Sequence, residues 1–122
     1  MKRSDLLLIA LVVAVGQVVN AEEGASPAKL RQMAADYYRW RNQTYPVASS
    51  DQGLHTWDDK LTDYSAEAVA AQHQHVNQLL AQVKGMATDS WSRDDRIDWL
   101  LFRAQLEREA FWARVLHADL CP

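Results

Sequence analysis

One stretch of the sequence constrains the fold more than any other: residues 93–118 form a helical segment with apolar side chains on two opposite faces. Ser92 supplies a capping hydroxyl at its start, and no glycine or proline interrupts it. A surface helix normally carries one apolar stripe, so this helix is expected to need a neighbour on each face. At about 100° per residue, one stripe contains Ile97, Leu100, Leu101, Ala104, Phe111, Trp112 and Val115, and the opposite stripe contains Trp99, Phe102, Leu106, Ala110 and Ala113.

Two further helices are expected at residues 27–43 and 66–87, each with a single apolar stripe. Ser26 and Ser65 stand at N-cap positions, and Pro27 occupies the first helical position, where its missing N–H costs no hydrogen bond. The chain is therefore predicted to be all-α, a three-helix antiparallel arrangement with the last helix between the other two. The first stripe contains Leu30, Met33, Ala34, Tyr37 and Trp40, and the second contains Val69, Val76, Leu79, Leu80, Val83 and Met86.

The segment between these two helices is expected to be a turn followed by a loop. Pro46 disfavours helix at the residue before it and can begin a short helical turn, which Gly53 would end as a C-cap. The polar loop that follows has no helical period. We expect its apolar side chains to anchor it against the rest of the chain; they are Leu54, Trp57, Leu61 and Tyr64.

Residues 1–21 have the organisation of a secretory signal peptide. A basic start precedes an apolar run, residues 6–19, which leads to a cleavage site after Ala21. As a helix the run would span about 21 Å, shorter than the ~30 Å hydrocarbon core of a bilayer, so a cleaved signal is favoured over a permanent anchor. The expected product is an exported protein, periplasmic or secreted, with residues 22–122 as a helical region and no stable membrane span.

The charge of the chain argues against a nucleic-acid partner. The formal net charge is −3, and loss of the signal peptide, which carries two basic residues and one acidic residue, would make it −4. No basic stripe interleaved with aromatic side chains occurs in the sequence. Binding to nucleic acid is therefore not expected.

The sequence contains no recognisable catalytic or metal-binding motif. His73 and His75 lie two residues apart on a helix and point about 200° apart, so they cannot share an ion. His117 and Cys121 have the four-residue spacing of metal pairs, but two ligands near a helix end do not make a site. As the only cysteine, Cys121 is either an unpaired thiol or half of a bridge whose partner lies elsewhere. No catalytic residue, metal ligand or cofactor is therefore assigned to this chain, and its binding residues are unknown.

Two stretches of the sequence resemble a bacterial protein family. "YYRWRNQTYPVASSDQGLHTWDDKLTDYS", residues 37–65, and "WSRDDRIDWLLFRAQLEREAFW", residues 91–112, are similar to the N-terminal region of the domain of unknown function 885 proteins. The family opens with an aromatic helix, an Asn-Pro-like turn, a glycine-containing loop with paired aspartates and a segment close to "RIDWLLFRAQLE". Tyr45 before the proline is a small departure from that turn. The resemblance covers roughly residues 30–120, and its last segment is the most specific part.

The resemblance implies a protein larger than this chain. Members of the family are several times longer, mostly helical and zincin-like, and they look like metallopeptidases with a zinc-binding motif of the HExxPGHH type far downstream. No position of this sequence matches that motif, so no zinc ligand or catalytic residue is carried over. The N-terminal helices are expected to form part of the wall over a cleft.

Two functions are compatible with these observations. In the first, the chain is the N-terminal fragment of an exported, zinc metallopeptidase-like protein and has no activity of its own. In the second, it is a free-standing exported helical module that binds a protein partner or a second copy of itself. In both, the stripe with Trp99, Phe102 and Leu106 is the expected docking surface, either for the remainder of a longer helical protein or for the partner.

Overall fold

A computed structural model describes the backbone of residues 25–119 and the side chains of residues 25–115. The prediction of an all-α chain is confirmed for this part, and none of its helices combines the length and apolar character that a membrane span needs. The predicted signal peptide and Cys121 lie outside the described residues, as does the side chain of His117. The elements are α1 (Pro27–Thr44), α2 (Pro46–Asp51), the 3-10 helix η2 (His55–Trp57), α3 (Ala66–Lys84) and α4 (Arg93–Asp119).

Each long helix begins at a serine whose hydroxyl accepts a hydrogen bond from a backbone N–H three residues later. This contact satisfies one of the donors that the first turn of a helix leaves without an intrahelical acceptor. The predicted starts of all three long helices are confirmed in this way. The contacts join Ser26 to the Lys29 N–H at 3.1 Å, Ser65 to the Ala68 N–H at 3.3 Å, and Ser92 to the Asp95 N–H at 3.1 Å.

The ends of the helices depend on the residues that follow them. α1 extends to Thr44, one residue beyond the prediction. α3 ends at Lys84, three residues before the predicted end, because Gly85 takes the cap position and glycine is a poor helix former. The short helical turn predicted to begin at Pro46 is confirmed as α2. Its C-cap is Gln52 and not the predicted Gly53, which follows the cap with a φ of +84°.

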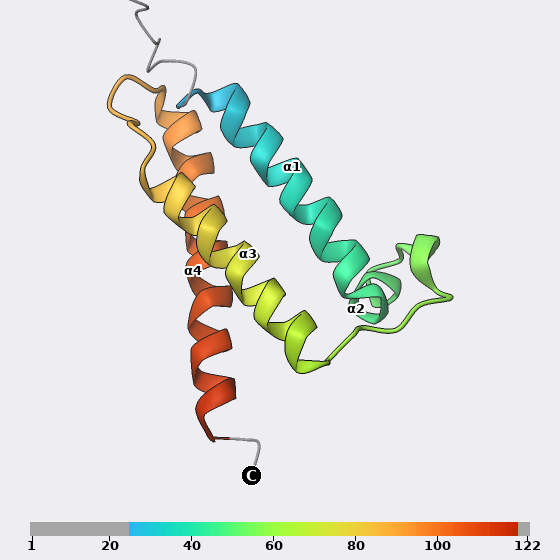
Figure 1. Cartoon of the computed structure of the whole chain (residues 1–122). Helices are drawn as coiled ribbons and strands as arrows, with labels where there is room; N and C mark the ends of the chain where they lie inside the picture. The colour runs from blue at the N-terminus through green and yellow to red at the C-terminus, as the bar shows by residue number, and fades with distance from the viewer. Residues whose placement is uncertain (1–24, 120–122) are drawn as a thin grey trace, which may run out of the picture.

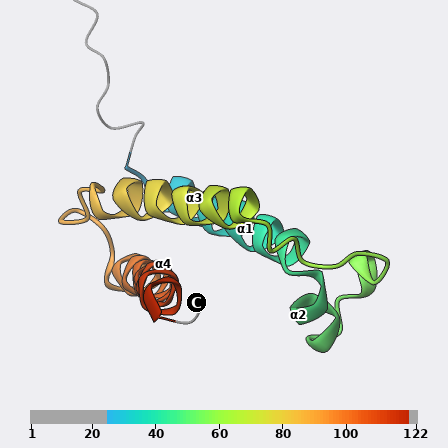
Figure 2. The same cartoon turned by 60° about the horizontal axis from the view of Figure 1, so that its bottom comes forward.

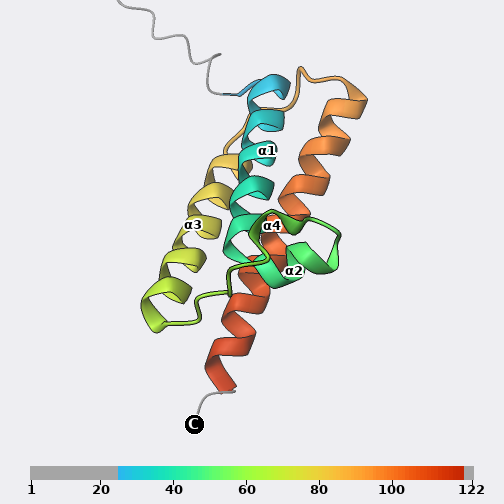
Figure 3. The ribbon, with the colours of Figure 1, turned by 90° about the vertical axis from the view of Figure 1, so that its right-hand side faces the viewer.

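The three long helices lie against one another with α2 at one end. Figures 1 and 3 show that α1 and α4 begin at the same end of the molecule, whereas α3 begins at the opposite end. The ion pairs between α1 and α4 occur in the same order along both helices: Arg31 contacts Asp95 near their starts, and Arg41 contacts Glu109 further along. The last turns of α4 extend past the ends of α1 and α3 in both views.

One face of α4 supplies the centre of the hydrophobic core. Leu106 is fully buried, and Phe102 packs edge-on against Tyr37 of α1 with ring centroids 5.5 Å apart. The Trp99 indole N–H donates to the carbonyl oxygen of Val83 at 2.8 Å, which satisfies an acceptor in the last turn of α3. The buried apolar residues are Leu30, Met33, Tyr37, Val76, Val83, Met86, Trp91, Phe102 and Leu106.

The stripe predicted to be the docking surface was the wrong one. Trp99, Phe102 and Leu106 belong to the core or pack against it, so α1 and α3 already cover them. This face of α4 is the inner one because the single stripes of α1 and α3 both meet it, and because the Trp99 N–H finds its acceptor there. The opposite stripe faces solvent, and its exposed large residues are Ile97, Leu100, Leu101, Phe111, Trp112 and Val115.

The apolar side chains of the loop after α2 do not anchor it, contrary to the prediction. Three of the four are exposed, and Leu61 is 85% exposed. The loop is closed instead by local polar contacts: Ser50 hydrogen bonds to the Asp58 carboxylate, and His55 Nδ1 lies 2.9 Å from the same group. These short-range contacts hold the loop without burial of most of its apolar side chains. The exposed residues are Leu54, Leu61 and Tyr64.

We predict that Leu106→Ala destabilises the protein by about 2–5 kcal/mol, because removing a fully buried side chain leaves a cavity in the core. The matched control Leu61→Ala removes the same atoms from an exposed side chain and should change the free energy of unfolding by less than ~0.5 kcal/mol. Guanidinium unfolding followed by circular dichroism measures both changes. Equal losses in the two variants would show that α4 does not turn this face to the core.

Candidate functional site

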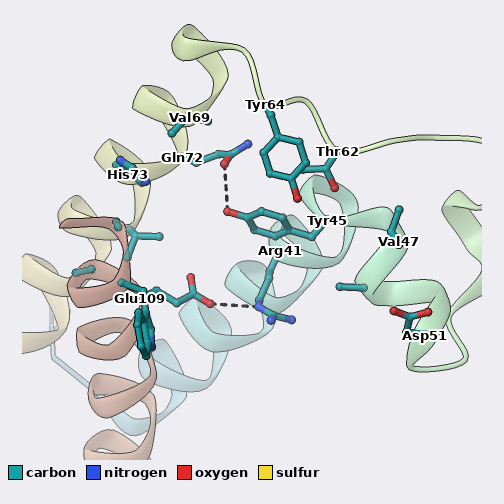
Figure 4. A pocket seen from close by; sticks show the side chains of 15 residues that line it. Arg41, Tyr45, Val47, Asp51, Thr62, Tyr64, Val69, Gln72, His73 and Glu109 are labelled. Carbon is teal, nitrogen blue, oxygen red and sulfur yellow. Dashed lines mark hydrogen bonds and ion pairs between the residues drawn. The ribbon is translucent and has the colours of Figure 1, made fainter. Parts of the chain in front are cut away.

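A groove of about 640 Å³ opens between five segments of the chain. It is bounded by the end of α1, by α2, by the loop before α3, by α3 itself and by the second half of α4, and Figure 4 shows side chains from these segments around it. No single segment forms the groove, so its shape depends on the packing of the helices. Its lining includes Arg41, Tyr45, Val47, Asp51, Thr62, Tyr64, Val69, Gln72, His73, Val76, Glu109 and Trp112.

An ion pair joins α1 to α4 within the groove (Figure 4). Arg41 Nε donates to Glu109 Oε1 at 3.2 Å, and these side chains are only 25% and 21% exposed. Gln105 Nε2 donates to the same Glu109 oxygen at 3.0 Å and to the Tyr37 hydroxyl at 3.2 Å. Glu109 is therefore the centre of a polar network that ties the two helices together.

Two tyrosine hydroxyls border this network, and both have raised pKa values. Burial is the main cause of the raised pKa of Tyr37, and hydrogen bonding to Glu109 raises it further. Burial also raises the pKa of Tyr45, with a smaller contribution from the negative charge of Glu109. The Tyr45 hydroxyl donates to Gln72 Oε1 at 3.1 Å and so links the end of α1 to α3. Both phenols stay protonated at neutral pH and serve as hydrogen-bonding groups.

The serines of α2 hold this short helix beside the groove. Ser49 is buried, and its hydroxyl donates to the carbonyl oxygen of Asn42 in α1 at 2.8 Å. Ser50 hydrogen bonds to the Asp58 carboxylate, and this contact lowers the pKa of that carboxyl. The two contacts connect α2 to α1 on one side and to the loop on the other, and Val47 of α2 lines the groove.

Two of the histidines considered in the sequence analysis and one of the acids lie in packed, groove-lining or paired positions. His75 packs against the Trp40 ring with ring centroids 4.3 Å apart, whereas His73 lines the groove. Asp95, at the start of α4, pairs with Arg31. Among the residues that the structure describes, no three His, Cys, Asp or Glu side chains are grouped so that they could hold a metal ion.

The groove has the chemistry of a binding surface. Its most polar members, Arg41 and Glu109, bind each other, and the hydrogen bonds of Tyr45 are also used within the protein. Val47, Tyr64 and Trp112 contribute exposed apolar surface. Apolar lining with a few fixed polar groups is typical of sites that bind ligands or segments of protein. An occupant would therefore meet mainly apolar contacts, the Arg41–Glu109 pair and the Asp51 carboxylate.

The sequence analysis did not find this groove or its polar network. Arg41 and Glu109 are 68 residues apart in the chain, and neither belongs to a recognisable motif. Each lies on the polar flank of its own helix, where a charged residue normally contacts water. Only the packing of α1 against α4 turns two ordinary surface charges into a shielded pair.

Comparison with known proteins identified no relative of this chain: no family model, no curated protein and no solved structure matches it. The resemblance to the domain of unknown function 885 proteins therefore stays a prediction.

We predict that the free energy of unfolding falls as the pH rises above the ordinary tyrosine pKa of 10.0. Tyr37 and Tyr45 hold their protons in the folded protein to higher pH than in the unfolded chain, so the unfolded state loses protons first and is favoured. Urea unfolding at several pH values between about 8 and 11 measures the decline. A variant with Tyr37→Phe and Tyr45→Phe should show a shallower decline, and an unchanged slope would contradict the prediction.

We predict that Glu109→Gln destabilises the protein by about 1–2 kcal/mol, because it leaves the mostly buried Arg41 without its anionic partner. Asp36→Asn is the matched control, since Asp36 pairs with Arg39 in an exposed position and exposed pairs contribute roughly 0–1 kcal/mol. Thermal unfolding at low and high salt compares the two. If the control were as damaging as Glu109→Gln, the shielding of the Glu109 pair would have no energetic effect.

Proposed function

We propose that this chain is the N-terminal region of an exported, zinc metallopeptidase-like protein and that it contributes a helical wall without catalytic groups. In this proposal α1, α3 and α4 form an antiparallel three-helix unit of a larger zincin-like fold, and residues 1–21 are the signal peptide. The proposal is supported by the resemblance of residues 37–65 and 91–112 to the domain of unknown function 885 proteins. One feature of the structure carries it: the uncovered apolar surface of the loop after α2.

That loop presents more apolar surface than its own contacts cover. Leu61 and Tyr64 are 85% and 76% exposed, and the groove beside them is open to solvent. Burial of apolar surface is favourable by roughly 25 cal/mol per Å², so a helix that covered the loop would be stabilised there. In the proposed longer protein, further helices lie over the loop and occupy the groove.

The proposal places the zinc site in another part of the longer protein. A catalytic zinc normally has three protein ligands, and the described residues contain no group that offers them. The sequence also lacks the family's zinc-binding motif. We therefore assign no catalytic step to these residues, whose proposed role is to support the cleft and form part of its wall.

A second candidate function is a free-standing exported helical module that binds a protein partner. The observation that favours it is the complete core: Leu106 and Val83 are 0% exposed, and no buried side-chain polar atom among the described residues lacks a hydrogen-bond partner. A unit with such a core does not require further helices in order to fold. In this case the groove beside Arg41 and Glu109 would receive the partner.

An immunoblot of cells that produce the protein tests the proposal. An antibody raised against residues 25–115 is expected to detect a species several times longer than 122 residues, in the periplasmic or secreted fraction. The captured species should cleave peptides and lose that activity with a zinc chelator, whereas the 122-residue chain should be inactive with added zinc. Detection only of a species of 122 residues or fewer would favour the free-standing module, and a cytoplasmic marker protein controls the fractionation.

A further inference from the structure

The outward face of α4 has a regular repeat that the core does not explain. Figure 2 looks nearly along α4 and shows α1 and α3 on one side of it. On the other side, exposed residues follow alternating steps of four and three, the spacing of coiled-coil seams, in which apolar residues recur about every 3.5 residues. We call this row the outer seam. It consists of Ile97, Leu101, Ala104, Arg108, Phe111 and Val115.

The outer seam is symmetric about the level of Leu106. The seam residues Ile97 and Leu101 each have a large apolar counterpart that lies as many residues after Leu106 as they lie before it. The two apolar residues that flank the seam, Leu100 and Trp112, are related in the same way. If a second α4 lies against the first in the opposite direction, these counterparts fall at the same height. A two-fold axis produces this arrangement, because each copy then offers the same surface to the other. The counterparts are Ile97 with Val115, Leu100 with Trp112, and Leu101 with Phe111.

The two central layers of such a pair combine a small residue with a long one. Ala104 of one copy lies at the height of Arg108 of the other, so the alanine leaves room for the arginine stem while its guanidinium reaches solvent. A polar residue in a coiled-coil seam weakens the pair but specifies its register. Here Arg108 disfavours any register that places it against Leu101 or Phe111.

The outward face is large enough to support a dimer. Its six exposed large residues present on the order of 600 Å² of apolar surface per copy, compared with ~800 Å² of total surface per partner in a standard interface. At 1.5 Å per residue, the outer seam is about 27 Å long. Exposed apolar area of this size on one helix face, divided into two groups by Ala104 and Arg108, favours an interaction surface.

We propose that this chain forms a two-fold symmetric homodimer in which the outer seams of two α4 helices pack in opposite directions. Ile97 and Val115 form the end layers, Leu101 and Phe111 form the next layers, and Arg108 lies near the axis. The dimer does not depend on the proposed function, which rests on the loop after α2.

Sedimentation equilibrium of the purified protein tests the dimer. We expect a monomer–dimer equilibrium in the unaltered chain and a dissociation constant at least about tenfold higher in Leu101→Asp, which places an unpaired charge against Phe111 of the second copy. Leu61→Asp is the matched control, because it puts the same charge at an exposed leucine outside the outer seam. Circular dichroism should show unchanged helicity in both variants, since both side chains are exposed.

Arg108→Leu tests the proposal in the opposite direction. Leucine would fill the seam next to Ala104 of the second copy, so the dissociation constant should fall by about tenfold. Three results would overturn the proposal: a chain that stays monomeric over the whole concentration range, a dimer that resists Leu101→Asp, or a dimer that Leu61→Asp weakens as much as Leu101→Asp does. Each outcome is independent of the length of the native protein found by immunoblotting.

Discussion

Burial of the inner face of α4 is the contact on which the rest of the structure depends. Leu106 and Phe102 occupy the space between α1 and α3, where they meet Tyr37 and Val83. α1 and α3 are helices of 18 and 19 residues with one apolar stripe each, and in proteins most of the stability of such helices comes from the packing of the apolar face. Both are stabilised by the same face of α4, so that loss of this face would leave neither helix with a partner for its stripe.

The groove is a consequence of that packing. Once Phe102 lies against Tyr37, the later turns of α4 bring Glu109 within reach of Arg41, and Gln105 bridges Glu109 to the Tyr37 hydroxyl. A shielded charge pair is stronger than one in water because the surrounding protein screens it less. The polar network therefore holds α1 and α4 in one relative position, and the groove has its shape before any occupant arrives.

Two apolar surfaces remain uncovered, and they differ in kind. The outer seam is a regular repeat on a rigid helix, a surface suited to another helix with the same repeat. The loop with Leu61 and Tyr64 is irregular and lies beside an open groove. It therefore suits a single neighbour whose surface is complementary to it in shape. The homodimer is proposed from the first surface and the longer metallopeptidase-like protein from the second, and the two surfaces meet at Trp112.

Local sequence signals determined the helices of this protein. Serine hydroxyls at the starts of the long helices, Pro46 at the first position of α2 and Gly85 after α3 act within a few residues of where they stand, so they could be interpreted without knowledge of the fold. The tertiary structure alone decided which stripe of α4 is buried, because both stripes have helical spacing and only contact with α1 and α3 distinguishes them. It also decided the groove, since Arg41 and Glu109 are 68 positions apart in the chain and carry no local signal that they will meet.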